Sequence, residues 1–388
     1  MRILVAHSRY RVAGGEDRYV TQLVDLLKPH HDVEVLMPSN LELSQSIGTA
    51  ARMTYSVRLA ARSERLIRSF RPDVVHVHNL YPSLGPAVHL AARRQKVPIA
   101  MTIHNLRLRC PNGLMFTQGQ PCNRCEAGNY ANAVVHRCFP SHLQAAAYGS
   151  ALWVHRFLLP LERMVDLFLA PSEFIRQRLL AWGIPDGRIR VVRNFVADVS
   201  NAPPPLGVFG LYVGRLSEEK GLRSLLAALA RADDPPFRIV GDGPLQQELV
   251  ALADRLGLIR TRFVGRLDAR QVRKVLREAR FLIMPSECDE NAPLALLEAM
   301  SSGLPAVVTR RGGLPELVGR GGGIICEPGD VAGLSEKLAT LMRDDGLCRT
   351  LGREALAIAK QEFTANRHRT SLEHAYQSLR PVHDAPPR

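Results

Sequence analysis

The 388-residue sequence contains few aromatic residues and little lysine. Phe, Trp and Tyr make up 6% of the residues, with two tryptophans in all. That is too few for the aromatic stacking surface of a typical nucleic-acid-binding protein, and no known nucleic-acid-binding module is recognisable, so we expect no nucleic acid among the partners. Only six of the 51 cationic residues are Lys. The others are Arg, whose planar guanidinium binds phosphates and carboxylates through two parallel hydrogen bonds.

Long hydrophobic runs are also missing. The apolar start of the chain is shorter than the hydrophobic region of a signal peptide, and no apolar stretch reaches the roughly 18 residues that suggest a membrane-spanning helix. The nearest candidate, Leu143–Leu161, is interrupted by His155 and Arg156, and we expect a core helix there rather than a wall of an acceptor site. A cytoplasmic protein is the expectation.

The formal net charge of +14 is concentrated in the first half of the chain. Residues 1–200 carry a net charge of +11, whereas residues 201–388 carry +3. A segment with helical periodicity in the first half bears a series of arginines: Arg52, Arg58, Arg62, Arg65, Arg68 and Arg71. Such a helix is typical of an element that binds an anionic membrane surface, here the inner face of the cell membrane, or of a solvated outer helix. Both interpretations stay open.

The seven cysteines do not follow the pattern of a secreted disulfide scaffold. Four of them have the spacing C-x11-C-x2-C-x12-C, and these are Cys110, Cys122, Cys125 and Cys138. This arrangement is typical of a structural zinc site with four thiolate ligands, which leaves no open position for catalysis. Four reduced thiols, or a redox pair at Cys122 and Cys125, are the alternatives.

Short apolar runs alternate with helical patterns along the whole chain. This alternation predicts an α/β protein with parallel sheets that are covered on both faces. The consecutive prolines of Asp198–Leu206 indicate a linker between two such series. We therefore expect two doubly wound, Rossmann-like domains facing across a cleft, at 1–200 and 201–388, with a cysteine-rich insertion at 106–142. Ligands of such sheets bind at the carboxyl ends of the strands.

Several predicted strand ends in the second half carry residues suited to phosphates or sugar hydroxyls. The loop GRLSEEKG at 214–221 places an Arg and a Lys beside the start of a helix, which suits a diphosphate. The next strand ends in GDGP at 241–244, a tight turn that lets a ligand approach the backbone. Glu290 lies in a later loop and Glu298 two turns into the helix that follows, where each can accept hydroxyl hydrogen bonds. A further strand leads to GGLPE at 312–316.

These motifs resemble glycosyltransferase family 4, whose members are retaining enzymes of GT-B fold. The resemblance rests on GRLSEEKG, on VGDGP, on the E-x7-E pattern within LLEAM, and on RGGLPELV. It extends to the loop Ala13-Gly14-Gly15-Glu16, to TIHN and to RNFV, so it covers most of the chain in the order of the family. The subgroup that carries CPNG…CxxC after TIHN is the nearer match.

The resemblance implies a role for each matching residue. Arg215 and Lys220 neutralise the diphosphate of the donor, and Glu290 contacts the transferred sugar, which His104 faces from the other domain. Glu298 holds the donor ribose. The remaining donor-binding residues that the resemblance implies are Gly15, Asn194, Gly241, Gly243, Val264 and Leu294.

The resemblance also implies the reaction. A hexosyltransferase of this kind moves a sugar from a UDP- or GDP-sugar to a hydroxyl of a glycan or lipid-linked acceptor, such as a cell-surface polysaccharide. The N-terminal domain binds the acceptor, the C-terminal domain binds the donor, and the final helix packs back on the N-terminal domain. No Asp-x-Asp follows a strand, so no catalytic metal is expected and zinc would be structural only.

One departure from the family pattern concerns the donor sugar. Many members have Glu-Gly-Phe-Gly where this chain has Glu290-Asn291-Ala292-Pro293. Pro293 has no backbone N–H, so a neighbour such as Leu294 would have to contact the diphosphate. Two alternative functions stay open. One is a GT-B nucleotide-sugar epimerase. The other is a basic interaction protein stabilised by structural zinc, which would not explain the loops suited to phosphate at the strand ends of the second half.

Overall fold

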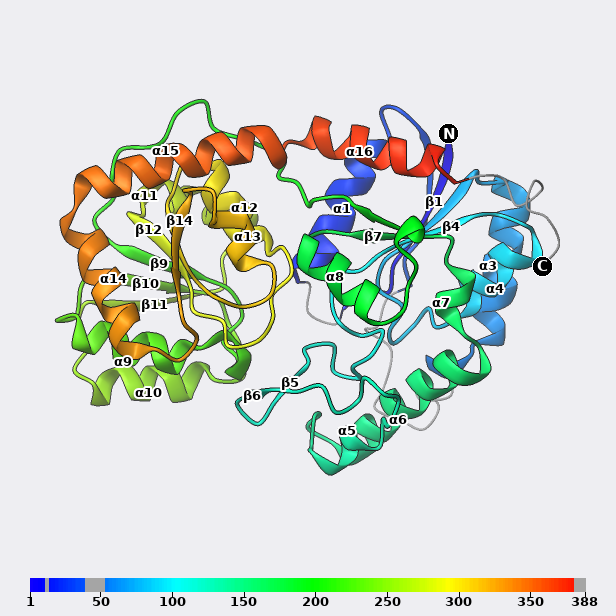
Figure 1. The fold of residues 1–388 in the computed structure, drawn as a ribbon, viewed down its shortest axis with the longest axis horizontal. Helices are drawn as coiled ribbons and strands as arrows, with labels where there is room; N and C mark the ends of the chain where they lie inside the picture. The colour runs from blue at the N-terminus through cyan, green and yellow to red at the C-terminus, as the bar shows by residue number, and fades with distance from the viewer. Residues whose placement is uncertain (11–13, 39–52, 380–388) are drawn as a thin grey trace. The chain divides into compact units, whose positions relative to one another are not determined.

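The computed structural model describes residues 1–10, 14–38 and 53–379, which form two compact α/β units (Figure 1). The first unit comprises Met1–Gln118, Cys122–Val192 and His368–Arg388. The second comprises Gly119–Pro121 and Arg193–Arg367, so the division along the chain precedes the proline-rich linker. Two residues of the motifs above, Ala13 and Arg52, lie outside the described residues.

The first unit alternates strands and helices up to residue 192. Its elements are β1 (Arg2–Ala6), α1 (Gly15–Leu27), β2 (Asp32–Leu36), α3 (Val57–Phe70), β3 (Val74–Val77), α4 (Ala87–Arg94), β4 (Ile99–Thr102), β5 (Phe116–Thr117), α5 (Asn132–Val135), α6 (His142–Trp153), a π-helical turn (Val154–Leu158), α7 (Leu161–Met164), β7 (Leu167–Ala170), α8 (Glu173–Ala181), a 3-10 turn (Asp186–Arg188) and β8 (Ile189–Val191).

The second unit repeats the alternation. Its elements are β6 (Gln120–Pro121), β9 (Gly210–Val213), a 3-10 turn (Glu218–Lys220), α9 (Leu222–Arg231), β10 (Phe237–Val240), α10 (Gln246–Arg255), β11 (Thr261–Gly265), α11 (Ala269–Glu278), β12 (Phe281–Met284), α12 (Leu294–Ser301), β13 (Ala306–Thr309), α13 (Leu314–Val318), β14 (Gly323–Cys326), α14 (Val331–Arg343) and α15 (Asp345–Glu362). Helix α16 (Ala365–Gln377) follows, and from His368 onward it belongs to the first unit.

Each unit contains a six-stranded parallel sheet. The strand order is β2-β1-β3-β4-β7-β8 in the first unit and β11-β10-β9-β12-β13-β14 in the second. The central strands, such as β3, β4 and β12, are buried at every position, because helices cover both faces of a parallel sheet. The predicted α/β class with two doubly wound sheets is confirmed.

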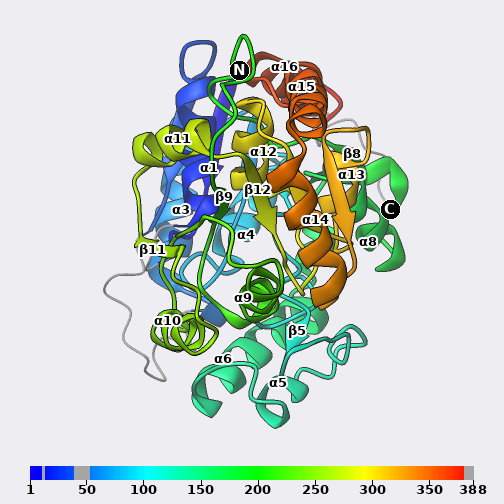
Figure 2. The same cartoon turned by 90° about the vertical axis from the view of Figure 1, so that its left-hand side faces the viewer.

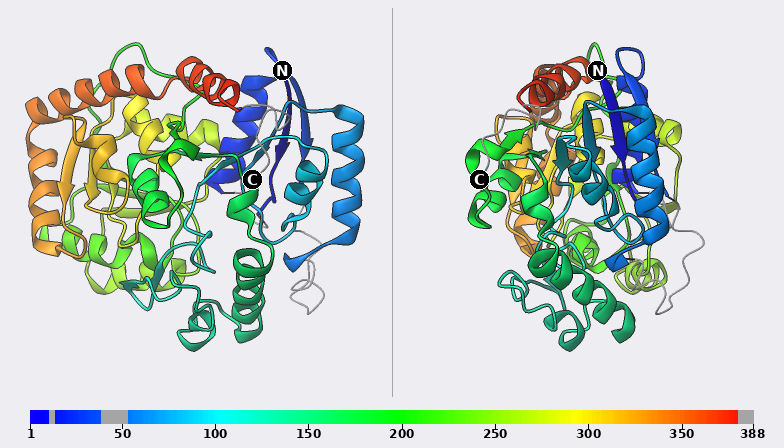
Figure 3. Two further views of the ribbon diagram at one scale, coloured as in Figure 1. Left: turned by 45° about the vertical axis from the view of Figure 1, so that its right-hand side comes forward. Right: turned by 90° about the vertical axis from the view of Figure 1, so that its right-hand side faces the viewer.

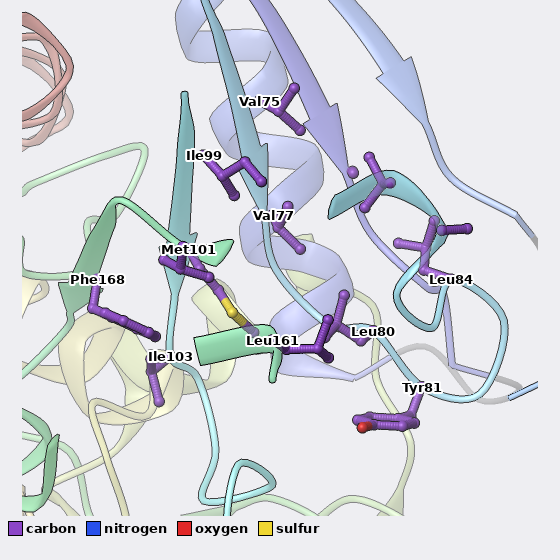
Figure 4. Packing of buried hydrophobic residues seen from close by; sticks show 14 of the residues in the cluster. Val75, Val77, Leu80, Tyr81, Leu84, Ile99, Met101, Ile103, Leu161 and Phe168 are labelled. Carbon is purple, nitrogen blue, oxygen red and sulfur yellow. The ribbon is translucent and has the colours of Figure 1, made fainter. Parts of the chain in front are cut away.

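The two-residue period of the strands divides the first sheet into two faces. Val75 and Val77 of β3 point to the same side as Ile99 and Met101 of β4, into one hydrophobic core (Figure 4). Helices α3 and α4 lie side by side next to this sheet (Figure 3). The intervening His76 belongs to the opposite face, where its Nδ1 is hydrogen-bonded to the hydroxyl of Tyr376 in α16 at 2.7 Å.

Helix pairs also cover the second sheet. Helix α9 packs beside α14, and α12 packs beside α15 (Figure 2). Leu225 and Leu229 of α9 and Leu338 of α14 are fully buried in the core between these helices and the sheet. Burying each such side chain stabilises the fold by about 1.5–3 kcal/mol.

The expectation of a core helix at Leu143–Leu161 is wrong for several of its large apolar residues. Helix α6 and the π-helical turn bury Ala145, Ala151 and Leu152, but Trp153 is 46% and Leu158 63% exposed. Leu143 and Phe157 are exposed as well. The packed face of the helix consists of small residues and Leu152, and the other large apolar side chains named here are exposed to solvent. Within the described residues, no helix combines the length and the apolar character needed to cross a membrane.

Candidate functional site

The loops singled out in the second half of the sequence lie at the carboxyl ends of adjacent strands. GRLSEEKG follows β9, GDGP follows β10, the loop with Glu290 follows β12, and GGLPE follows β13. These four strands are neighbours in the sheet order β10-β9-β12-β13, so the sequence motifs converge at one edge of one sheet. That is the edge where ligands of doubly wound sheets bind.

The GDGP turn fits tightly against the loop that carries Arg215. Gly241 has a φ of +138°, and a Cβ there would lie 1.8 Å from the carbonyl oxygen of Gly214. A Cβ at Gly243 would lie 2.3 Å from the carbonyl oxygen of Leu216. Only glycine allows this approach of two backbones. Val264 lies on the next strand, β11, whose Gly265 carbonyl accepts a 2.8 Å hydrogen bond from the Gly241 N–H.

The two predicted cations differ in their surroundings. Arg215 is exposed, and its own carbonyl oxygen accepts a 2.8 Å hydrogen bond from the Tyr212 hydroxyl. Lys220 ends a 3-10 turn, and its Nζ lies 2.6 Å from Oε1 of Glu290. The sequence predicted that Lys220 and Glu290 belong to the same site. It gave no indication that they form an ion pair with each other.

Lys220 and Glu290 keep each other ionised at the carboxyl edge of the sheet. Burial raises the pKa of Glu290, but the Lys220 ammonium and a 2.7 Å hydrogen bond from the Ser286 hydroxyl outweigh it, and the net result is a pKa below the ordinary value. Burial lowers the pKa of Lys220, but the Glu290 carboxylate dominates and the pKa is raised. Both groups are therefore ionised at neutral pH, and the pair carries no net charge.

Helix α12 starts beside this pair. Pro293 is its N-cap and Leu294 its first residue, so the first available helical N–H groups come from Leu294 onward. Glu298 lies one turn further along α12 and is partly exposed. Asn194 supports the loop before the helix, because its Nδ2 donates a 2.9 Å hydrogen bond to the carbonyl of Ala292. Its Oδ1 is buried without a hydrogen-bond partner.

Two predicted site residues belong to the first unit. Gly15 is exposed at the start of α1, after the N-cap Gly14. His104 follows β4, and its Nε2 is hydrogen-bonded to Nδ1 of His78 at 3.0 Å. Burial, together with neighbouring histidines, holds the pKa of His104 well below its ordinary value. At neutral pH, His104 is therefore a neutral hydrogen-bonding group.

Sequence reasoning missed several polar residues beside His104. A pocket of the first unit is lined by His78 and His104 and also by Glu16, Asn105 and Arg107. The hydroxyl of Tyr10 donates a 2.9 Å hydrogen bond to Oε2 of Glu16. Glu16 directly follows the GG motif and Arg107 lies two residues after TIHN, and this closeness in sequence is the signal that could have identified them.

The four clustered cysteines line a second pocket of the first unit, together with His136. All four are free thiols. Burial and the neighbouring thiols raise the pKa of Cys125 to about 12, so that thiol is neutral without a bound cation. In the part of the chain that the structure describes, no three or more His, Cys, Asp or Glu side chains are placed so that they could hold a metal ion.

We expect Glu290→Gln to destabilise the protein at neutral pH by about 1–3 kcal/mol, because it leaves the largely buried Lys220 ammonium without its counter-charge. The contribution of Glu290 is fully present above its ordinary pKa of 4.5 and is lost as the pH falls through its lowered pKa in the folded protein. The difference in urea midpoint between wild type and variant should therefore be constant near neutrality and shrink in acid.

Glu248→Gln is the matched control, because Glu248 forms its ion pair with Arg223 on the exposed surface of the same unit. This variant should lose much less stability than Glu290→Gln. Equal losses in the two variants would contradict the assigned role of the buried pair.

Two protein-family models match the chain. The model described as Glycosyltransferase Family 4 matches residues 13–198, and the model described as Glycosyl transferases group 1 matches residues 202–357. Together they include all strands of the second sheet, all strands of the first sheet except β1, and every candidate residue of the second unit.

Similar proteins include enzymes with related names. The 2-deoxystreptamine N-acetyl-D-glucosaminyltransferase of Streptomyces fradiae is 31% identical, over 80% of this chain and 72% of its own. A glycogen synthase of Mycobacterium tuberculosis is 28% identical, over 94% of this chain and 91% of its own.

Solved structures share the fold over nearly the whole chain. Sucrose-phosphate synthase from Thermosynechococcus elongatus has a TM-score of 0.72 at 17% identity, with 97% of this chain and 98% of that chain covered. HepE of Anabaena in complex with UDP and glucose has a TM-score of 0.69 at 19% identity, with 97% and 99% covered. Both likenesses confirm the predicted GT-B fold. The chain therefore belongs to the glycosyltransferase family that the group 1 and family 4 models describe, and it is a hexosyltransferase.

Proposed function

We propose that this protein moves a sugar, with retention of the anomeric configuration, from a UDP- or GDP-sugar to a hydroxyl of a glycan or lipid-linked acceptor. One observation carries the proposal: the loops with Arg215, Lys220 and Glu290 converge at the carboxyl edge of one sheet. The solved HepE complex, which contains UDP and glucose, supports a nucleotide-sugar donor for this fold. A glycan acceptor fits the name of the related glycogen synthase.

The second unit would bind the diphosphate of the donor with cations and N–H groups, and its sugar and ribose hydroxyls with carboxylates. The exposed Arg215 guanidinium and the Lys220 ammonium face the diphosphate, aided by the first N–H groups of α12 at Leu294. Glu298 accepts hydrogen bonds from the ribose, and Glu290 contacts the transferred sugar. The base lies against the backbone of Gly241, Gly243 and Val264. For the first unit, the proposal keeps the roles that the resemblance implies: Gly15 would contact a diphosphate, and His104 would hydrogen-bond to a sugar as a neutral imidazole.

This arrangement suits a reaction in which the diphosphate leaves. In the transition state, negative charge develops on the leaving diphosphate and positive charge on the sugar. Preorganised cations stabilise the negative charge. In this proposal, no carboxylate acts as the nucleophile that a double displacement would require. We propose that the acceptor hydroxyl attacks from the face that the diphosphate leaves, and that the diphosphate oxygen takes its proton. No metal cofactor is part of this proposal for catalysis.

We expect Arg215→Ala to lower the rate of sugar transfer at least about a hundredfold, because one charge-assisted contact to the leaving diphosphate is lost. Lys220→Ala should have a similar effect, with some loss of stability since Glu290 loses its partner. The assay measures products from radiolabelled UDP- and GDP-sugars, with and without glycan acceptors.

Arg270→Ala, which removes an exposed arginine of α11 in the same unit, should retain the wild-type rate. Near-wild-type transfer by Arg215→Ala would refute its role. An epimerised nucleotide sugar formed without acceptor would favour the alternative function, a nucleotide-sugar epimerase.

We further propose that the first unit docks on the anionic inner face of the cell membrane. The described arginines of α3 and its C-cap, including Arg62, Arg65 and Arg68, are exposed, whereas Leu59 and Ile67 are buried. On α6 and the turn after it, the rings of the exposed Trp153 and Phe157 lie next to each other, tilted by 47°, with centroids 5.7 Å apart. Cations and exposed aromatic side chains are the groups that bind anionic bilayer surfaces.

Liposome flotation tests this docking. Wild-type protein should float with vesicles that contain phosphatidylglycerol and stay behind with purely zwitterionic vesicles, since each cation near the surface contributes on the order of 1 kcal/mol. The triple variant Arg62→Gln, Arg65→Gln, Arg68→Gln should lose most of this binding. Equal flotation with both kinds of vesicle defeats the proposal.

The cysteine cluster is proposed as a structural zinc site. Cys110, Cys122, Cys125 and Cys138 line one pocket, and four thiolates suit zinc, although the sulfurs would have to move closer together to coordinate it. Bound zinc would also deprotonate the thiols whose pKa burial raises. The role of the metal would be to hold together the loops that carry the four cysteines.

Elemental analysis of protein purified without added metal should give close to one zinc per chain, and Cys122→Ser with Cys125→Ser should abolish it. Cys288→Ser and Cys326→Ser, in the second unit, serve as controls and should leave the metal content unchanged. A wild-type protein with no bound metal and four reactive thiols would overturn the assignment.

A further inference from the structure

Two arginines of the pocket beside His104 form no ion pair with any carboxylate that the structure describes. It lies at the carboxyl ends of β3 and β4, and Arg107 and Arg156 both line it. Among the described residues, no Asp or Glu forms an ion pair with either guanidinium. Arginines nearby behave differently, because Arg109 pairs with Glu162 and Arg178 pairs with Glu126. The two unpaired cations are thus a property of the pocket.

Arg107 is held in place by the backbone, and part of its guanidinium remains unbonded. One Nη donates a 3.2 Å hydrogen bond to the carbonyl of Asn112, and the guanidinium carbon lies 5.5 Å from the centroid of the Tyr148 ring. Nε is buried without a hydrogen-bond partner. A Cβ at Gly113 would lie 3.1 Å from Nε, so the turn Pro111-Asn112-Gly113 fits closely around this side chain. A buried donor without a partner is costly unless a ligand satisfies it.

Arg156 is fixed in a similar way. Its Nη1 donates hydrogen bonds to the carbonyl of Glu126 at 2.6 Å and to the hydroxyl of Tyr130 at 3.4 Å. These neutral acceptors orient the guanidinium but leave its charge uncompensated. The second cation of the pocket is therefore also positioned by the fold.

The acidic residues that line the pocket compensate these charges only in part, through the electrostatic attraction between Glu16 and Arg107. Glu162 is already paired with Arg109. Glu16 accepts hydrogen bonds through Oε2 from the Tyr10 hydroxyl at 2.9 Å and from Nδ2 of Asn105 at 3.3 Å. Its Oε1 is buried without a hydrogen-bond partner, 4.0 Å from Nδ1 of His7. One carboxylate thus faces two guanidinium groups, and it offers a free oxygen to a hydroxyl.

We propose that this pocket binds an acceptor that carries an anionic group, a carboxylate or a phosphate, next to its reacting end. Arg107 and Arg156 would bind the anion, and Oε1 of Glu16 would accept a hydrogen bond from an acceptor hydroxyl. The inference rests on the proposed transferase function and specifies its acceptor. It also localises part of the +11 charge of residues 1–200, because both arginines line one pocket.

Binding of matched neutral and charged probes tests the proposal. The carboxylate pair is methyl glucoside and methyl glucuronide, and the lipid-phosphate pair is citronellol and citronellyl phosphate. Isothermal titration calorimetry on the full chain should show that the charged member of one pair binds at least about tenfold more tightly than its neutral partner, since arginine–anion hydrogen bonds are charge-assisted. The pair that shows this preference identifies the source of the anion.

Arg107→Gln should abolish the preference and Arg156→Gln should reduce it. Arg163→Gln is the matched control, because Arg163 lies exposed on α7, beside the pocket residues Leu161 and Glu162. Thermal unfolding shows whether each variant is folded. If Arg107→Gln does not fold, the binding preference of Arg156→Gln alone tests the proposal.

Equal binding of neutral and charged probes, no binding of either charged probe, or a preference that survives in the folded arginine variants would overturn the inference. Titration of the same proteins with UDP shows whether only the inference about the acceptor is wrong or the proposed transferase function as well. UDP binding by the wild type and by all three variants keeps the transferase proposal standing, whereas absence of UDP and GDP binding in the wild type contradicts it.

Discussion

The ion pair between Lys220 and Glu290 is the interaction on which the candidate donor site depends. It joins the loop after β9 to the loop after β12 across 2.6 Å, and it keeps both side chains ionised although they are largely buried. Because Glu290 neutralises the Lys220 ammonium, the proposed diphosphate site needs the exposed Arg215 and the helical N–H groups of α12 in addition to Lys220. A ligand that competes for Lys220 would also loosen Glu290, which couples diphosphate binding to contact with the sugar.

Much of the fold could be predicted from the sequence, because the physical signals are local. Continuous apolar strands alternating with amphipathic helices indicate parallel sheets, and the family motifs at strand ends fix their carboxyl edge as the site. Both the GT-B fold and the glycosyltransferase family were predicted in this way and are confirmed. The roles of single residues, such as Glu298 on the ribose or Asn194 near the donor, remain predictions.

The rest could not be predicted because it depends on tertiary placement. Helix α6 is apolar in sequence, but it packs through Ala145 and Ala151, and this leaves Trp153 exposed. Likewise, no sequence pattern distinguishes Arg107 from the other arginines of the basic first half of the chain. Its significance comes from contacts with Asn112 and Tyr148 and from the absence of a carboxylate partner among the described residues, none of which a sequence pattern records.

We propose that the carboxyl edge of the second sheet binds a nucleoside diphosphate through Arg215 and Lys220. Calorimetric titration of the wild type and Arg215→Ala with UDP, UMP, GDP and GMP tests it most directly. The account predicts that one diphosphate binds at least about tenfold more tightly than its monophosphate, because its second phosphate meets the two cations, and that Arg215→Ala removes most of this difference. Equal affinity for diphosphate and monophosphate, or a difference unchanged in Arg215→Ala, would contradict it.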